Sequence, residues 1–171
     1  MVRYSICLTV GTLHRPFDRL LRFFSELDLG NVKGLIQYGG SASTLINNAP
    51  VELQKKAFTS NSELSAAMAR SDLVIAHAGV GSIIQANSLE KPLVLLPRLS
   101  KYGEHFDDHQ LQIADVVRHI PGITVSDDSI EDFRQRVVNF LQSPPTVRRA
   151  LGGNKLPEYV QRWVAQVQGS M

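Results

Sequence analysis

The stretch SDLVIAHAGVGSIIQANSLEKPLVLLP, residues 71–97, holds two apolar runs on either side of a short helical pattern. The runs at 73–77 and 92–97 are apolar at successive positions, as in strands that are buried on both faces. Residues 82–89 between them fit a short helix. This order of elements predicts two parallel strands joined by a helical crossover.

The same alternation extends over the chain to residue 141. We expect strands at 3–10, 32–38, 51–58, 73–77, 92–97 and 123–125, and helices at 16–27, 60–69, 82–89, 107–117 and 129–141. The strand at 51–58 is more polar than the others, which favours an edge position. Asn61 or Ser62 is expected to cap the second helix, and an Asp the fourth. The pattern predicts an α/β fold with a single Rossmann-like, doubly wound parallel sheet.

The composition is typical of a soluble globular protein of one domain, with 171 residues, 43% of them hydrophobic and 20% charged. A net charge of +2 gives no argument for nucleic acid, and we expect no such partner. Cys7 is the only cysteine, so a reducing compartment fits. No apolar run reaches the ~18 residues of a membrane span, and the N-terminus lacks a secretory signal. We therefore expect a cytoplasmic protein.

The alternation breaks near the C-terminus. SPPTVRRALGGNK, residues 143–155, carries two prolines and two glycines, and we expect a linker there between a domain at 1–142 and an amphipathic helix at 156–171. One face of that helix is apolar, through Leu156, Tyr159, Val160, Trp163, Val164 and Val167. The stripe either packs on its own domain or is a docking face.

The segment HAGVGS, residues 77–82, is the first candidate site. In open parallel sheets, ligands bind beyond the carboxyl ends of the strands, and this segment follows such an end. Gly79 and Gly81 permit close approach of the backbone, and the helix expected from Ser82 offers unpaired N–H groups to a phosphate. A plain strand-to-helix turn is the alternative. The sequence has no Walker A loop, dinucleotide fingerprint, nucleophile elbow or D-x-D pair.

KYGEHFDDHQ, residues 101–110, is the second candidate site. His105 and His109 lie four residues apart, but a metal site needs a helix throughout and a third ligand, and Gly103 indicates a loop. We therefore expect no metal. The better functional interpretation is a polar cluster that binds the hydroxyl groups of a ligand, formed by Asp108, His109 and Gln110 at a helix start. Local hydrogen bonding of His109 at the helix start is the alternative.

The segment at 71–97, followed after ten residues by DHQLQIA at 108–114, resembles the donor-binding half of glycosyltransferase family 28. TVGT (9–12), PFDRL (16–20) and IQYG (36–39) resemble the same family, so the likeness covers most of residues 4–118. Full-length members have two Rossmann-like halves of a GT-B fold, acceptor half first, and this chain has room for one. It is similar to split members, namely bacterial capsule and exopolysaccharide pairs and the soluble subunit of the dolichol-linked N-acetylglucosaminyltransferase. PRLSKYGEHFDDHQ, 97–110, is most similar to the bacterial pairs.

The resemblance implies roles for individual residues in binding a UDP-sugar. It assigns the diphosphate to the N–H groups around Gly79, Gly81 and Ser82, and it puts His77 at the mouth of the cleft. It assigns contacts with the donor sugar to Asp108, His109 and Gln110. It also implies that Gly11 and Thr12 form the first loop, at the junction of the two halves. On the helix after the glycine loop, Gln85 stands where the family usually has an acid that binds the ribose hydroxyls, while Glu90 lies too near the helix end to replace it.

The function implied is that of the donor-binding, catalytic subunit of an inverting transferase acting on a polyprenyl-diphosphate-linked acceptor. No cofactor or metal is expected besides the UDP-sugar. The partner would be a membrane-anchored, acceptor-binding subunit that holds this chain at the inner face of the membrane and supplies the general base, with His14 a candidate by position only. A non-catalytic nucleotide-sugar-binding or regulatory subunit is the first alternative. Another nucleotide-sugar enzyme, such as an epimerase, is the second.

Overall fold

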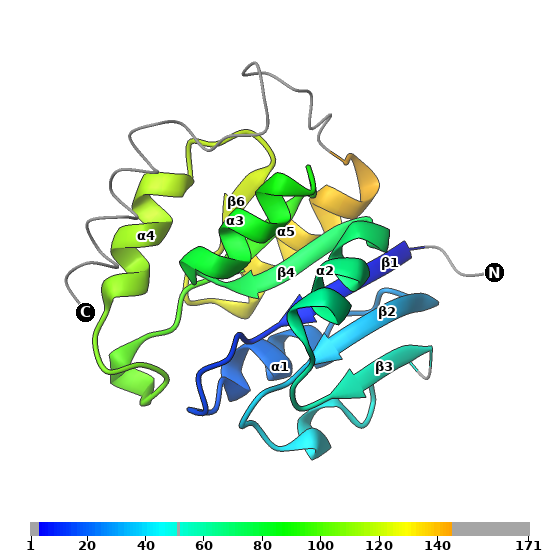
Figure 1. Ribbon diagram of the computed structural model, residues 1–171, viewed down its shortest axis with the longest axis horizontal. Coiled ribbons are helices and arrows are strands. Elements are labelled where there is room, and N and C mark those ends of the chain that lie inside the picture. The colour runs from blue at the N-terminus through cyan, green and yellow to red at the C-terminus, as the bar shows by residue number, and fades with distance from the viewer. Residues whose placement is uncertain (1–3, 51, 145–171) are drawn as a thin grey trace.

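The computed structural model describes residues 4–50 and 52–144. At its centre lies a six-stranded sheet with the order β3-β2-β1-β4-β5-β6 (Figure 1). The strands are β1 (Tyr4–Thr9), β2 (Val32–Gln37), β3 (Leu53–Lys56), β4 (Leu73–His77), β5 (Leu93–Leu96) and β6 (Ile123–Val125). All five pairings are parallel, which confirms the predicted sheet. The polar strand β3 lies at an edge, as its sequence predicts.

Helices cover both faces of the sheet (Figure 1). The described helices are α1 (Asp18–Ser25), α2 (Asn61–Arg70), α3 (Val80–Ser88), α4 (His109–Val117) and α5 (Ile130–Gln142), with 3₁₀ turns η1 (Ser43–Ile46) and η2 (Ser100–Tyr102). Two apolar clusters result. Ile75 of β4 belongs to the cluster of α1 and α5, and its neighbour Val74 to the cluster of α2, α3 and α4. This alternation explains why the strand is apolar throughout.

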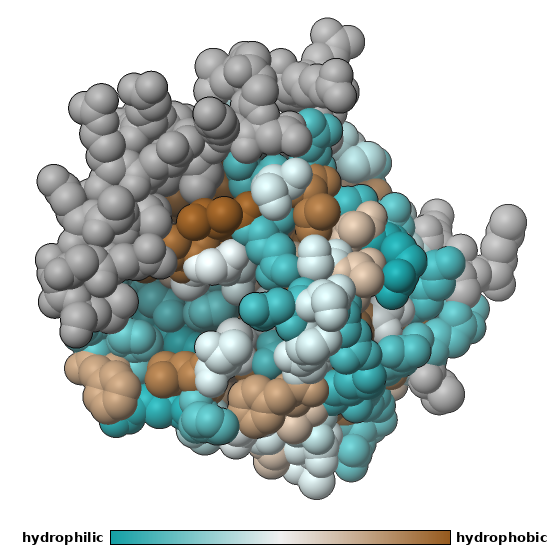
Figure 2. Space-filling model, viewed as in Figure 1, coloured by the Kyte–Doolittle hydropathy of each residue, from teal (hydrophilic) through white to brown (hydrophobic). Residues whose placement is uncertain are grey.

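Figure 2 shows the outer surface of the layer formed by α2, α3 and α4 as a mixture of polar and apolar side chains. Apolar side chains gather between α3 and α4 in this view. Ile84 of α3 and Leu111 of α4 are large apolar side chains that are exposed.

The strand order reverses between β1 and β4, which are neighbours in the sheet with Thr9 opposite Ala76. The chain passes outward to β2 and β3 on one side and to β5 and β6 on the other. The loops that leave the carboxyl ends of β1 and β4 therefore diverge at a switch point, which is where open α/β sheets bind ligands. This switch point positions the candidate site.

The start of α3 and the N-cap of α2 differ from the sequence predictions. α3 begins at Val80 with Gly79 at the N-cap position, so Ser82 lies within the first turn and not before it. The N-cap of α2 is Ser60, whose Oγ accepts a hydrogen bond of 3.2 Å from the backbone N–H of Glu63, and not Asn61 or Ser62. Ser60 and Glu63 have the S-x-x-E spacing of a capping box, a signal in the sequence that was overlooked.

The start of α4 shows why an aspartate there need not cap. Asp108 holds the N-cap position but its side chain does not cap the helix. Its Oδ1 accepts instead from the backbone N–H of Ser100, at 2.8 Å. Asp107 Oδ1 accepts from the N–H of His109, at 3.0 Å. The two acids thus shape the loop before α4.

The predicted helix at 156–171 and most of the predicted linker at 143–155 lie outside the described residues, so these domain boundaries stay predictions. Across residues 4–50 and 52–144, no helix has the length and apolar character needed to cross a bilayer.

Candidate functional site

The N-terminus of α3 opens at the carboxyl end of β4. The first helical hydrogen bond runs from the N–H of Ile83 to the carbonyl of Gly79, at 3.1 Å. The N–H groups of the first turn, at Val80, Gly81 and Ser82, precede this bond and have no acceptor within the helix. Gly81 is exposed, and apart from its chain neighbours and the backbone of α3 itself, no heavy atom lies within 4 Å of the position that a Cβ would occupy there. The turn therefore presents bare backbone donors to an incoming anion.

Gly79 lacks a side chain for a different reason. A Cβ on Gly79 would lie 2.1 Å from Nε2 of His77, and a Cβ on Gly11 would lie 2.4 Å from Cε1 of the same ring. The imidazole of His77 thus fills the space between the turns that follow β4 and β1. Gly11 also has a φ of 81°, a backbone conformation that favours glycine. The structure brings three predicted site residues together here.

The imidazole of His77 is neutral at physiological pH. Burial, and then the charges of Arg98 and His105, lower its pKa from 6.5 to about 3. Its Nδ1 is buried and has no hydrogen-bond partner among the described residues. A neutral ring has one N–H donor and one acceptor, so His77 can offer a hydrogen bond to an anion but contributes no net charge.

The buried side-chain amide of Gln37, which is not among the predicted site residues, holds the β1–α1 loop. Gln37 at the end of β2 donates from Nε2 to the carbonyl of Gly11 at 2.9 Å, and its Oε1 accepts from the hydroxyl of Thr9. The Thr9 hydroxyl in turn accepts from the N–H of Gly11, at 3.1 Å. Thr12, the next residue, is exposed. The signal for Gln37 was a polar residue that directly follows the apolar pair Leu35 and Ile36 at the end of a strand.

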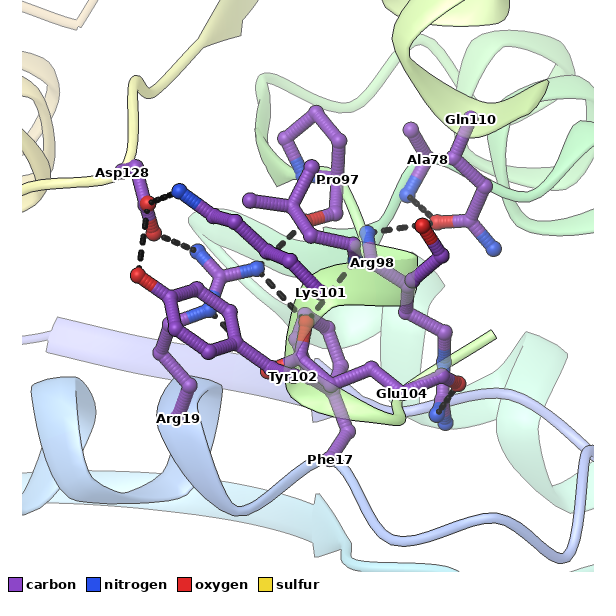
Figure 3. A network of polar contacts seen from close by, with 12 residues as sticks. Phe17, Arg19, Ala78, Pro97, Arg98, Lys101, Tyr102, Glu104, Gln110 and Asp128 are labelled. Atoms are coloured by element: carbon purple, nitrogen blue, oxygen red, sulfur yellow. Dashed lines mark hydrogen bonds and ion pairs between the residues drawn. The ribbon is translucent and has the colours of Figure 1, made fainter. Parts of the chain in front are cut away.

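Gln110 lies at the site, but its side-chain oxygen is occupied. Oε1 accepts from the backbone N–H groups of Ala78, at 3.1 Å, and Arg98, at 3.0 Å (Figure 3). Gln110 is buried, and this bifurcated contact joins the carboxyl ends of β4 and β5. Only its amide N–H groups remain for a ligand, which narrows the predicted role in reading sugar hydroxyls.

Asp108 and His109 stand beside Gln110 at the start of α4. Asp108 is exposed, and the N–H of Ser100 that it accepts from holds the pKa of its carboxyl below the usual range. His109 is half-buried. His105 contacts Asp107 at 3.0 Å between Nδ1 and Oδ1. In the described part of the chain, no group of three or more His, Cys, Asp or Glu side chains is placed to hold a metal ion.

The remaining candidates lie on other parts of the same edge. Ser82 is 9% exposed, so its hydroxyl is less accessible than the neighbouring backbone. Gln85 lies on α3 and donates to the carbonyl of Asn61 at 3.5 Å, the upper limit for a hydrogen bond. His14 is exposed in the β1–α1 loop, with its ring centroid 5.0 Å from that of Phe58.

A network of charged and polar side chains beside the site, which extends from the buried Glu104 to the exposed Lys101, was not foreseen (Figure 3). Arg19 of α1 forms an ion pair with the buried Glu104, at 2.8 Å, and a second with Asp128, at 3.0 Å. Asp128 also accepts from Lys101 Nζ and from the hydroxyl of Tyr102. The segment PRLSKYGEH, residues 97–105, supplies Lys101, Tyr102 and Glu104. Contacts between residues this distant in sequence carry no local pattern.

Comparisons with known proteins identify the family of the chain. Residues 5–147 match the model of the glycosyltransferase family 28 C-terminal domain. A protein of Debaryomyces hansenii named UDP-N-acetylglucosamine transferase subunit ALG13 is 30% identical over 104 residues, covering 59% of this chain and 44% of that protein. Its namesake from Candida albicans is 37% identical over 70 residues, covering 41% and 22%. The chain thus matches less than half the length of these curated relatives.

Solved structures show the fold. An NMR structure of ALG13 superposes with a TM-score of 0.59 and 18% identity, covering 95% of this chain and 94% of that one. MurG of Acinetobacter baumannii gives 0.61 and 17%, covering 99% and 50%, and the kitacinnamycin glycosyltransferase gives 0.63 and 16%, covering 96% and 40%. The fold is therefore one half of a GT-B glycosyltransferase.

Proposed function

Because the chain belongs to the glycosyltransferase family 28 C-terminal domain, we propose that it is the donor-binding, catalytic subunit of a two-subunit UDP-sugar transferase. Its curated relatives are named as subunits of a UDP-N-acetylglucosamine transferase. Its fold corresponds to 94% of an ALG13 structure but to half or less of the single-chain MurG and kitacinnamycin enzymes. A second chain would supply the missing half.

The observation that carries the proposal is the open first turn of α3. Sugar transfer from UDP leaves a diphosphate whose negative charge develops in the transition state. Backbone N–H groups aimed at that charge, together with the helix dipole, stabilise it without a cation. The exposed Gly81, with no heavy atom beyond its chain neighbours and the backbone of α3 within 4 Å of its Cβ position, leaves room for the diphosphate to approach them.

The other candidate residues support the same assignment. His77, held between Gly11 and Gly79, presents a neutral imidazole next to the turn. Asp108, His109 and the amide N–H groups of Gln110 lie at the next helix start, where they would meet the donor sugar. Gln85 would accept one hydrogen bond from a ribose hydroxyl and donate another, in place of a charge-assisted pair.

The general base and the acceptor site belong to the proposed partner. An inverting transfer needs a base that removes the proton of the acceptor hydroxyl. His77 is a poor base, since its pKa is about 3. His14 is exposed on the β1–α1 loop and remains a candidate by position. We propose a membrane-anchored, acceptor-binding partner that presents a polyprenyl-diphosphate-linked saccharide and keeps this chain at the inner face of the membrane.

A second candidate is a nucleotide-sugar-binding subunit without turnover of its own. Gln85 favours it, because a neutral amide at the ribose position weakens the hold on the nucleotide. In that case a donor-site variant would bind less UDP while the partner kept its transfer rate. If the chain is instead the catalytic subunit, a donor-site variant loses UDP binding and transfer together.

Co-expression with the partner gene tests the proposal. The purified complex is offered a panel of UDP-sugars with a lipid-linked acceptor, and transfer is scored by mass spectrometry of the lipid product. We expect one donor to be used and Gly81→Val to abolish transfer. A matched substitution at the far end of α3, Ser88→Val, should leave it intact. Transfer that continues with Gly81→Val would reject the catalytic assignment.

A further inference from the structure

The segment between β5 and α4 contains a buried cation whose partners are backbone atoms. Arg98 is 0% exposed and the largest fully buried side chain among the described residues. Its guanidinium donates to the carbonyls of Val10 at 2.8 Å, Arg15 at 3.0 Å, Pro16 at 3.3 Å and Glu104 at 2.9 Å. Three of these four carbonyls belong to the β1–α1 loop, 88 to 82 positions earlier in the chain.

A charge in this place fixes backbone rather than another side chain. Burial lowers the pKa of Arg98 to about 10, so the guanidinium remains charged at neutral pH. The ring of Phe17 lies against it, with Cζ 4.6 Å from the ring centroid. The planar, rigid fork of arginine reaches several acceptors at once, which a lysine ammonium does not reproduce.

The same residue is tied to the glycine turn. The backbone N–H of Arg98 donates to Gln110 Oε1, which also accepts from the N–H of Ala78 (Figure 3). Gly11, which follows the anchored Val10, lies against the ring of His77. Arg98 therefore connects the loop after β1 with the turn after β4. These are the two segments between which the ring of His77 lies.

The segment that carries Arg98 is itself anchored. Glu104 pairs with Arg19, and its Oε2 also accepts from the N–H of Leu99, at 2.9 Å. Arg19 donates to the carbonyl of Pro97, at 2.6 Å. The residue before Arg98 and the residue after it are thus held by one buried ion pair (Figure 3).

We propose that Arg98 is a positioning residue that holds the β1–α1 loop against the glycine turn before any donor binds. It touches no ligand itself. Its role in UDP affinity rests on the proposed function, whereas its hold on the loop does not.

Amide hydrogen exchange on the full chain without ligand tests the hold. The probes are two bonded amides of the loop, Gly11, which donates to Thr9 Oγ1, and Phe17, which donates to Ser41 Oγ at 2.8 Å. In the wild type we expect both to be protected. In Arg98→Lys they should exchange at least about tenfold faster, while amides in β1 and β4 keep their rates. Arg136→Lys makes the same exchange of residue type on α5, at a partly exposed arginine that bonds the side chains of Asp132 and Thr124, and is the control.

Calorimetry with UDP tests the consequence for binding. We expect affinity to fall about tenfold in Arg98→Lys, because binding must then order the loop, and to stay unchanged in Arg136→Lys. Equal acceleration across all strands in Arg98→Lys would make Arg98 an ordinary core residue and overturn the proposal. So would unprotected Gly11 and Phe17 amides in the wild type, a measurement that does not depend on whether the variant folds. If the wild type fails to bind UDP, the proposed function fails, while the exchange comparison still judges the loop.

Discussion

The two glycines of the HAGVGS segment have different physical reasons. Gly79 leaves room for the imidazole of His77, while Gly81 leaves the first turn of α3 open to solvent. A glycine next to a strand end therefore need not face a ligand. At Gly79 a side chain would collide with a residue of the same turn, but at Gly81 it would meet only whatever binds there.

Gly81→Val should separate binding from folding. The added side chain has open space in the free protein, so the unfolding midpoint should change little. It would block the N–H groups of the turn, and losing one hydrogen bond to a charged phosphate costs about 1.5–3 kcal/mol. We expect UDP affinity by calorimetry to fall about tenfold or more. Ser88→Val, at the other end of α3, is the control, and equal affinities of the two variants would contradict the site.

His77 should make stability depend on pH. Its folded-state pKa of about 3 lies below the ordinary 6.5, so the unfolded chain binds the proton more readily. Its contribution is complete above about pH 6.5 and is lost as the pH falls towards 3, by up to ~1.4 kcal/mol per unit. Between pH 6.5 and 5, urea unfolding should therefore show a steeper loss in the wild type than in His77→Asn. Parallel slopes would mean that the imidazole charges freely in the folded protein.

The site residues that the sequence reveals are those in local motifs. Gly11, His77 and Gly79 lie together in the structure, since each lies at or just after a strand end at the switch point. Gln37 and Arg98 went unassigned because their importance lies in bonds to residues 26 and 88 positions away. No spacing rule reports such contacts. The side-chain oxygen of Gln110 makes contacts of the same long-range kind, because it accepts from the backbone N–H groups of Ala78 and Arg98.

At the scale of elements, α2 shows how a short helix is started. Ser60 Oγ accepts from the N–H of Glu63, and the Glu63 carboxylate contacts Lys56 and Thr59. These contacts hold the pKa of Glu63 below its usual value, Lys56 first. The helix start thus joins the end of the edge strand β3 to α2.

Removing this cap should cost a definite amount. Ser60→Ala should lower the free energy of unfolding by about 1 kcal/mol, the usual cost of an N-cap serine. Ser62→Ala, two residues on and exposed, should change it by less than about 0.5 kcal/mol. Urea unfolding of both variants, with unchanged m-values, is the measurement. A larger effect at Ser62 would restore the cap that the sequence first indicated.

The elements themselves were predictable because their periodicity is strong. All six strands and five helices occur where apolar runs and helical faces predicted them. Their ends were less predictable, since a helix begins where backbone donors find partners. α3 starts at Val80 with Gly79 at its N-cap position, so Ser82 has no capping role.

At the scale of the molecule, the strand order collects the loops of β1, β4 and β5 at one edge, where the proposed leaving group meets backbone dipoles. Such stabilisation needs no divalent cation. We therefore expect EDTA to leave transfer by the reconstituted complex within about twofold of its untreated rate, the range of ordinary assay variation around a step without a metal. A loss that magnesium or manganese restores would direct attention back to His105 and His109.

The C-terminal segment, residues 145–171, lies outside the described residues. The described residues up to 144 form an apolar cluster on each face of the sheet. We therefore expect the core to fold without the apolar stripe at 156–167. That stripe includes Tyr159 and Trp163, and aromatic residues are common anchors of interfaces. A chain ending at residue 155 should therefore unfold cooperatively near the wild-type temperature but fail to co-purify with the membrane partner.

Trp163→Ala refines this test within the full chain. If Trp163 anchors the partner, the substitution should weaken the complex by about 2 kcal/mol or more, the threshold for an interface hot spot. Binding is measured by titrating the partner in detergent, with Gln168→Ala, beyond the apolar stripe, as the control. The opposite result is equally clear. If the truncated chain aggregates and Trp163→Ala sharply lowers the melting temperature, the stripe packs on its own domain, and the partner must dock elsewhere.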